Sequence, residues 1–263
     1  GCWSVMYTAP FSGIDPSIEA VLRDLISEDD PYHYKHLRRF ARTLQVFLDQ
    51  KPSGVVLELG TSGVIPQALS VLAPDLEVRV TNFDPLLPKL HTYSIGGRDY
   101  DAYQIDLEKE FIPVPNEVFD WVLCCEVIEH MEIDPMFMLS EVNRVTKTGG
   151  SLLVTTPNAV SSRALTKMVA GIEPYFYMQY NKDRSYHRHN YEYSIHSLMQ
   201  VVKAAGFDGS IWTEDNFEDS MPTVPDRLRK AGFNINHIGD NMITVARKVS
   251  GVVDRFPSTM YTD

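Results

Sequence analysis

The feature that most constrains the fold is an apolar segment that ends in an acid and breaks into a glycine turn. Residues 55–63 read VVLELGTSG, and residues 64–72 continue as a predicted helix with Pro66 near its first turn. A strand, a glycine turn and a helix in this order open the nucleotide-binding domains of the α/β class. Gly60 and Gly63 carry no Cβ and therefore let the backbone approach a ligand closely. Their spacing differs from G-x-G-x-x-G, which argues against an NAD-dependent dehydrogenase.

Further strands are predicted downstream, and an acid follows three of them. These three strands and the acids after them are residues 77–83 with Asp84, 100–105 with Asp106, and 119–125 with Glu126. A helix over residues 134–146 precedes another strand at 150–155. Strands that alternate with helices predict a parallel sheet, with ligands bound beyond the carboxyl ends of its strands. We therefore expect a Rossmann-like, doubly wound, mostly parallel α/β sheet.

Taken together, these segments resemble the class I S-adenosylmethionine-dependent methyltransferases over about residues 37–248. ELGTSG resembles their first motif, with Ser62 and Val64 at the second and third glycine positions of E-x-G-x-G-x-G. FDWVLCCEVIEHM and EVNRVTKTGGSLLVTTPN look like the fourth and fifth strands of the ubiquinone-type O-methyltransferase branch. GIEPYFY and HRHNYEYSIHSL are similar to bacterial methyltransferases that tailor sugars and natural products. The resemblance implies a seven-stranded sheet and an enzyme that uses S-adenosylmethionine.

The resemblance also implies which residues hold the cofactor. Asp84 corresponds to the acid that binds the ribose hydroxyls, Asp106 and Leu107 to the segment beside the adenine amine, and Glu126 to a contact near the adenine. The residues expected to contact the cofactor are Glu58, Gly60, Thr61, Ser62, Gly63, Asp84, Asp106, Leu107, Glu126 and Val127.

A cluster of ionisable residues follows the predicted strand 119–125. If a helical turn begins there, Glu126, Glu129 and His130 stand at i, i+3 and i+4 and share one face. Methyl transfer to a hydroxyl needs an aligned nucleophile and removal of its proton. We expect His130 to be the catalytic base and Glu129 to orient its ring, with no metal ion and with resistance to chelators.

An insertion of about forty residues lies between the strand that ends at Thr155 and a helix that begins near Ser194. It is rich in aromatic and imidazole groups, which suit the cover of a small polar ligand, although they can also serve only to pack the insertion on the core. We expect residues 160–193 to form a substrate lid with Tyr177, Tyr186, His187 and His189 at the acceptor. The predicted domains are an N-terminal helical cap over residues 1–50 and the methyltransferase domain over 51–263.

Charge and composition limit the classes of binding partner that the chain can have. The net charge is −11 and the basic residues form only short groups, so a nucleic-acid partner is unlikely and a small-molecule acceptor is favoured. No apolar run is long enough to span a membrane, and three cysteines without zinc spacing fit core thiols of a cytoplasmic biosynthetic enzyme. The sequence carries no feature that specifies an oligomeric state.

Two alternatives stay open at this point. The E-x-x-E-H pattern also resembles the metal site of RNA 3′-terminal 2′-O-methyltransferases, with Glu126, Glu129, His130 and either His187 or His189 as ligands. Such ligands suit Mn²⁺ or Mg²⁺. The other alternative is a non-catalytic cofactor-binding protein whose irregular glycine turn marks a decayed site. The preferred interpretation remains O-methylation of a sugar or natural-product intermediate.

Overall fold

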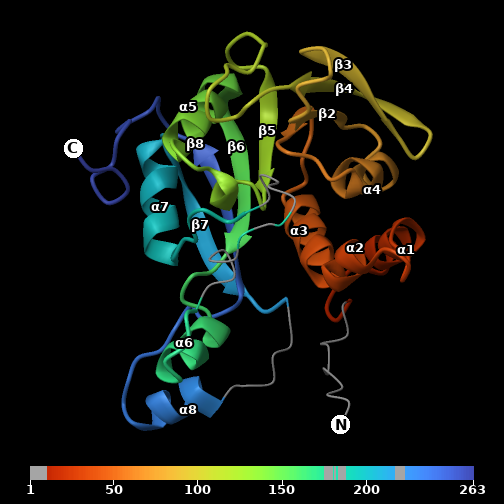
Figure 1. Ribbon diagram of the computed structural model, residues 1–263. Helices are drawn as coiled ribbons and strands as arrows, with labels where there is room; N and C mark the ends of the chain where they lie inside the picture. Colours follow the sequence, from red (N-terminus) through yellow and green to blue (C-terminus); the bar gives the residue numbers. More distant parts are fainter. Residues whose placement is uncertain (1–10, 175–179, 181, 183–187, 217–222) are drawn as a thin grey trace.

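The centre of the molecule is one twisted sheet in the order β3-β4-β2-β1-β5-β6-β8-β7 (Figure 1). The computed structural model describes residues 11–174, 180, 182, 188–216 and 223–263. The strands are β1 Val55–Glu58, β2 Glu77–Asn82, β3 Leu90–Ile95, β4 Arg98–Gln104, β5 Phe119–Cys125, β6 Thr146–Pro157, β7 Phe207–Glu214 and β8 Asn241–Lys248.

The expected Rossmann-like sheet is confirmed, but its predicted size of seven strands is wrong. The five strands β4, β2, β1, β5 and β6 are parallel, and β8 runs antiparallel between β6 and β7. The strand in excess of the predicted seven is β3, which pairs antiparallel with β4 at the edge of the sheet. Gly96 and Gly97 turn this hairpin with φ of 59° and 72°. A Gly-Gly pair between two β-type runs is a hairpin signature, so the additional strand was readable from the sequence.

Helices cover both faces of the sheet (Figure 1). The predicted start of the helix at Asp134 is confirmed by its side-chain cap, and Asp15 caps the first helix in the same way. The helices are α1 Pro16–Leu25, α2 Pro31–Lys35, α3 Leu37–Asp49, α4 Val64–Leu72, α5 Pro135–Val145, α6 Ser162–Val169, α7 Ile195–Ala204 and α8 Thr223–Lys230, with a short 3₁₀ turn, η1, over Ile128–His130. None of the described helices is both long and apolar enough to cross a membrane.

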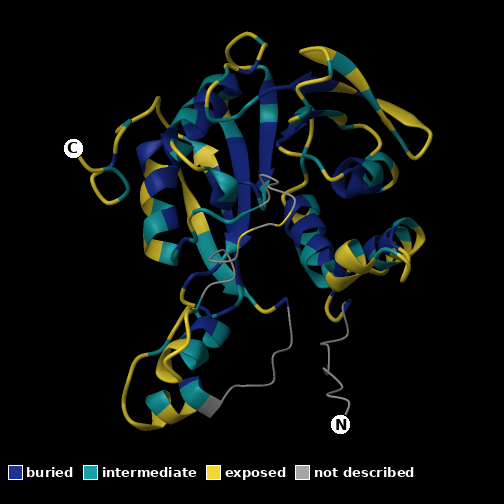
Figure 2. Cartoon of the chain, in the orientation of Figure 1, coloured by how far each residue is buried: buried dark blue, intermediate teal, exposed yellow. Residues whose placement is uncertain are grey.

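Alternating residues of the central strands divide the core into two layers. On β5, Val122 packs with α5 and α7, whereas Leu123 packs with α1, α3 and α4. The residues coloured as buried therefore lie along the central strands and on the helices that flank them (Figure 2). Because α1 and α3 share this second core with β1, β5, β6 and β8, the N-terminal helices are part of the packed structure rather than a separate lobe.

Helix α3 is also tied to the far edge of the sheet by charge. Arg42 of α3 donates to both carboxylate oxygens of Glu214, at 2.6 and 3.1 Å, where β7 ends. A two-pronged arginine–carboxylate pair fixes orientation as well as distance. This contact holds α3 near the carboxyl end of β5.

Candidate functional site

The glycine turn after β1 is held by the neighbouring strand β2. The N–H of Gly60 donates to the hydroxyl of Thr81 at 2.9 Å, and the N–H of Thr61 donates to the carbonyl of Thr81 at 3.0 Å. The hydroxyl of Thr61 then accepts from the N–H of Gly63 at 2.9 Å. Both glycines have positive φ, 60° and 88°, so each occupies a conformation that disfavours a side chain. Ser62, between them, is exposed.

The edge hairpin packs directly on this turn. A Cβ at Gly63 would lie 2.5 Å from the Cδ1 of Ile95 and 2.9 Å from the hydroxyl of Tyr93. Gln67 of α4 meets the hairpin turn at Gly96, where a Cβ would lie 2.3 Å from its Oε1. The β-hairpin therefore covers the glycine turn from one side.

Three of the expected cofactor residues lie at the carboxyl ends of neighbouring strands. Glu58 is the last residue of β1, Asp84 follows β2, and Asp106 follows β4, and these strands are neighbours. Asp84 accepts from the N–H of Leu86 at 3.0 Å, and Asp106 pairs with Lys109 at 3.2 Å. A surface hollow of about 470 Å³ is lined by Asp106 and by residues of the same strand ends, including Phe83 and Gln104. Leu107 packs against the core beneath Asp106.

Glu58 is a buried carboxylate at the base of this edge. Burial raises its pKa to about 7, against the opposing effect of a hydrogen bond from Thr61. Its Oε2 makes no hydrogen bond among the described residues. A buried acceptor that faces the glycine turn is a position where a ligand donor would be stabilised.

Glu126 differs from its expected role. Its backbone is left-handed, with φ 55°, and its Oε1 accepts from Asn241 at 2.6 Å and from Thr155 at 3.1 Å. These partners lie on β8 and β6, on the opposite side of β5 from Asp106. Arg39 of α3 lies 3.7 Å away; although burial alone would raise the pKa of Glu126, this guanidinium holds it below its usual value. The adenine contact predicted for Glu126 is therefore not supported by the direction of its side chain.

The next residue, Val127, connects the glycine turn with the segment that follows β5. It is buried, and a Cβ at Gly60 would lie 3.1 Å from its Cγ2. Val127 therefore packs against the glycine turn, and its contact with the cofactor stays a prediction. The single helical turn predicted after β5 is replaced by the left-handed Glu126 and the short η1 turn.

Glu129 of η1 is completely buried. Its Oε2 accepts from the hydroxyl of Thr156 at 2.9 Å, its carboxyl group hydrogen-bonds to that of Glu126, and its Oε1 has no partner among the described residues. Burial, together with the negative charge of Glu126, raises the pKa of Glu129 well above its usual value.

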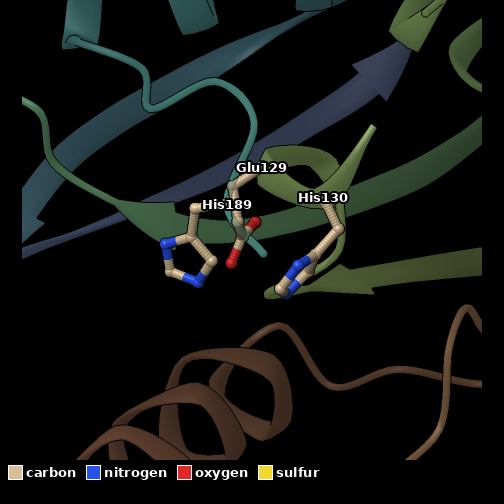
Figure 3. A group of neighbouring side chains, drawn as sticks. All are labelled: Glu129, His130 and His189. Carbon is tan, nitrogen blue, oxygen red and sulfur yellow. The ribbon is translucent and has the colours of Figure 1, made fainter. Parts of the chain in front are cut away.

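Two histidines lie on either side of Glu129 (Figure 3). The Nδ1 of His130 is 3.0 Å from the carbonyl oxygen of Arg188, and the Nδ1 of His189 is 3.0 Å from Oε1 of Glu192. Their rings meet edge to face with centroids 4.9 Å apart. Because an oxygen acceptor faces each Nδ1, each of these nitrogens is placed to donate a proton, and in a neutral imidazole the lone pair then lies on Nε2. The carbonyl of Arg188 orients the His130 ring, and the orienting role of Glu129 stays a prediction.

The end of the insertion is attached to Glu129 and His130 by the main chain. The N–H groups of Asn190 and Tyr191 both donate to the carbonyl of Glu129, at 2.7 and 3.2 Å, and the side-chain amide of Asn190 donates to the carbonyl of His130 at 2.9 Å. These contacts bring His189 into the site. Asn190 was not predicted, because nothing in its local sequence distinguishes it from a loop residue. The predicted acceptor residues Tyr177, Tyr186 and His187 lie outside the described part of the chain.

Solved structures share this fold. A SAM-dependent methyltransferase from Archaeoglobus fulgidus superposes with a TM-score of 0.53 and 16% identity, over 79% of this chain and 92% of that one. A possible histamine N-methyltransferase from Thermotoga maritima gives 0.52 and 16%, over 88% and 99%. At these identities the likeness concerns the fold alone.

A family model described as a methyltransferase domain matches residues 32–210, which is more than half of the chain. Among curated protein sequences none matches this one significantly. The matched range includes the glycine turn, the acids after β2 and β4, and the cluster of Glu129, His130 and His189. With the fold and the family model in agreement, the chain belongs to the methyltransferase-domain family and is an S-adenosylmethionine-dependent enzyme.

Proposed function

We propose that this enzyme transfers the methyl group of S-adenosylmethionine to an oxygen of a small polar acceptor, such as a sugar or a natural-product intermediate. The observation that carries this proposal is the cluster of Glu129, His130 and His189 next to the glycine turn, which Val127 contacts. An amine can attack a sulfonium methyl group through its own lone pair, whereas a hydroxyl must first lose its proton. Two half-buried imidazoles and a buried carboxylate supply what a hydroxyl needs.

The cofactor is expected to lie across the carboxyl ends of β1, β2 and β4. We expect Asp84, which follows β2, to accept from the ribose hydroxyls, and Asp106, which lines the surface hollow, to lie beside the adenine. Gly60 and Gly63 give the methionine end of the cofactor access to the backbone. Methyl transfer then takes place between this end and the cluster, across Val127.

In the reaction, the acceptor oxygen attacks the methyl carbon in line with the carbon–sulfur bond. The enzyme aligns the two reactants and lowers the cost of deprotonating the hydroxyl. His130 is central to the second task, because its Nδ1 is tied to Arg188 and its Nε2 carries the lone pair. Two chemistries are open to that nitrogen: acceptance of the proton, or coordination of a cation that acidifies the hydroxyl.

The experiment is a screen with S-adenosylmethionine labelled in its methyl group. Hydroxylated sugars, phenols, amines and short RNA 3′ ends are offered, and products are located by mass spectrometry. His130→Gln is expected to lower turnover about 10²–10⁴-fold with cofactor affinity unchanged. His196→Gln, on an exposed histidine of α7, is the matched control. Labelling of nitrogen or carbon only, or of RNA only, would contradict the proposal.

A further inference from the structure

We propose that Glu129, His130 and His189 form a binding site for one divalent transition-metal cation, and that the acceptor binds to this cation through two neighbouring oxygens. The inference rests on the proposed function for the presence of an oxygen acceptor. It goes against the expectation from the sequence that the enzyme works without a metal.

The first argument is distance. One potential ligand atom from each of the three side chains lies within 4.8 Å of the others. Two atoms that bind the same cation at about 2.1 Å can be at most about 4.2 Å apart. The three groups are therefore within a small side-chain rotation of a common coordination sphere, and the Glu129 carboxylate lies beside the two imidazole rings (Figure 3).

The second argument is the orientation of the histidines. A histidine that binds a metal donates its other ring N–H to a carbonyl or a carboxylate, which fixes the tautomer and the plane of the ring. Both forms occur here: His130 faces the carbonyl of Arg188, and His189 faces the carboxylate of Glu192, each at 3.0 Å from Nδ1. Both Nε2 atoms are thereby prepared as electron-pair donors on the same side of the site.

The third argument is the buried oxygen of Glu129. The residue has no exposed surface, and its Oε1 lacks a hydrogen-bond partner among the described residues, whereas Oε2 is bound by Thr156. An unsatisfied buried acceptor carries a desolvation cost. A cation bound by this oxygen and the two imidazoles would remove that cost, which makes this oxygen an independent indication of a ligand.

Glu126 is not part of the proposed coordination sphere. Thr155, Asn241 and Arg39 surround its carboxylate, and its side chain is directed toward β6 and β8. In the RNA-modifying enzymes that share the E-x-x-E-H pattern, both glutamates are ligands. Here the first glutamate instead accepts hydrogen bonds from Thr155 and Asn241.

Two imidazoles and one carboxylate leave coordination positions for substrate. A site with three protein ligands is open, in the manner of catalytic rather than structural metal sites. An acceptor with two adjacent oxygens, such as a vicinal diol or a hydroxy acid, can fill two open positions and so be oriented as well as activated. This narrows the acceptor class within the proposed function.

The cation acidifies the hydroxyl that it binds. The hydroxyl proton passes to solvent water, and an oxygen lone pair forms the bond to the methyl carbon. The carbon–sulfur bond breaks with its electron pair retained by sulfur, which becomes a neutral thioether. The products are a methyl ether and S-adenosylhomocysteine, and the oxidation state of the cation does not change.

The test measures Mn²⁺ binding by the full chain after chelator treatment and dialysis. Electron paramagnetic resonance reports the free ion, and pulsed methods count the nitrogen atoms bound to manganese. We expect one Mn²⁺ per chain with two imidazole nitrogens. His189→Gln should retain one nitrogen and bind at least about tenfold more weakly, and Glu192→Gln, which loosens His189, should weaken binding about 10–100-fold.

His196→Gln is the matched control and should bind Mn²⁺ as the wild type does. Calorimetry with S-adenosylhomocysteine verifies that each variant is folded. No Mn²⁺ binding by a wild-type protein that binds S-adenosylhomocysteine would overturn the metal site and leave the proposed function intact. Binding without imidazole nitrogens, or binding unchanged in His189→Gln, would also overturn it. Failure of the proposed function would appear separately, as the absence of oxygen methylation with any acceptor.

Discussion

The backbone N–H of Asn190 donates to the carbonyl of Glu129 at 2.7 Å, although the two residues come from distant parts of the chain. This contact joins the end of the inserted segment to the 3₁₀ turn that follows β5. It places His189 opposite His130 and so completes the cluster on which the proposed chemistry depends.

Asn190→Ala should therefore reduce turnover more than cofactor affinity. The substitution removes the donor to the carbonyl of His130 while the main-chain contacts to Glu129 remain. Because the ligand geometry loosens without loss of a ligand, we expect kcat to fall about 10–100-fold. Steady-state kinetics with each substrate varied would measure this. A parallel loss of S-adenosylmethionine affinity would show that the segment serves the cofactor instead.

Asp84→Ala should weaken S-adenosylmethionine binding by about 1.5–3 kcal/mol, because two ribose hydroxyls lose a charged acceptor. Isothermal titration calorimetry provides the measurement. Asp101→Ala, at an exposed carboxylate on β4, is the matched control and should bind as the wild type does. Equal affinities in the two variants would remove Asp84 from the cofactor site.

Gly63→Ala should destabilise the fold more than Gly97→Ala. Both glycines have positive φ, so each substitution carries a backbone cost of about 1–2 kcal/mol. Only Gly63 also meets a neighbour, since its Cβ would lie 2.5 Å from Ile95, whereas a Cβ at Gly97 would meet nothing within 4 Å. Overpacking adds about 1–3 kcal/mol, which urea unfolding would resolve. Equal losses would mean that the hairpin does not press on the glycine turn.

The stability of the cofactor-free protein should depend on pH through Glu58. Its pKa is raised from 4.5 to about 7 by burial, so the folded state holds a proton that the unfolded state releases. Its favourable contribution is complete below about pH 4.5 and is lost as the pH rises through about 7, at a cost of up to about 3 kcal/mol. Glu58→Gln should remove this dependence. Urea unfolding at pH 5 and pH 8 should therefore show a smaller pH effect in the variant than in the wild type, and parallel changes would refute the assignment.

Much of the fold could be predicted because the relevant signals are local. Pro16 after Asp15 marks the start of α1, and the apolar run over 119–125 matches β5 in both bounds. The edge strand β3 was not predicted although Gly96 and Gly97 mark its turn, since the predicted strands are those that an acid follows or a helix precedes.

The sequence predicts some of the residues that cluster at the site, but not the contacts that these residues make. Glu129 and His130 are adjacent in a recognisable pattern, and they do lie in the cluster. Their partners depend on contacts that no local pattern encodes: the carbonyl of Arg188 orients His130, and the left-handed backbone of Glu126 turns its side chain toward Asn241. These details follow from the packing of the insertion and of β8.

Glu129 has two separable tasks: its main-chain carbonyl holds the inserted segment, and its side chain enters the cluster. Exchange of the insertion between related enzymes should thus succeed only when the donor segment brings amide groups that reach this carbonyl. Without these contacts, a grafted segment chosen for new acceptor specificity would not be held next to the cluster of Glu129 and His130. Selection of loops by their anchoring pattern, ahead of their side chains, is the practical route to altering what this scaffold methylates.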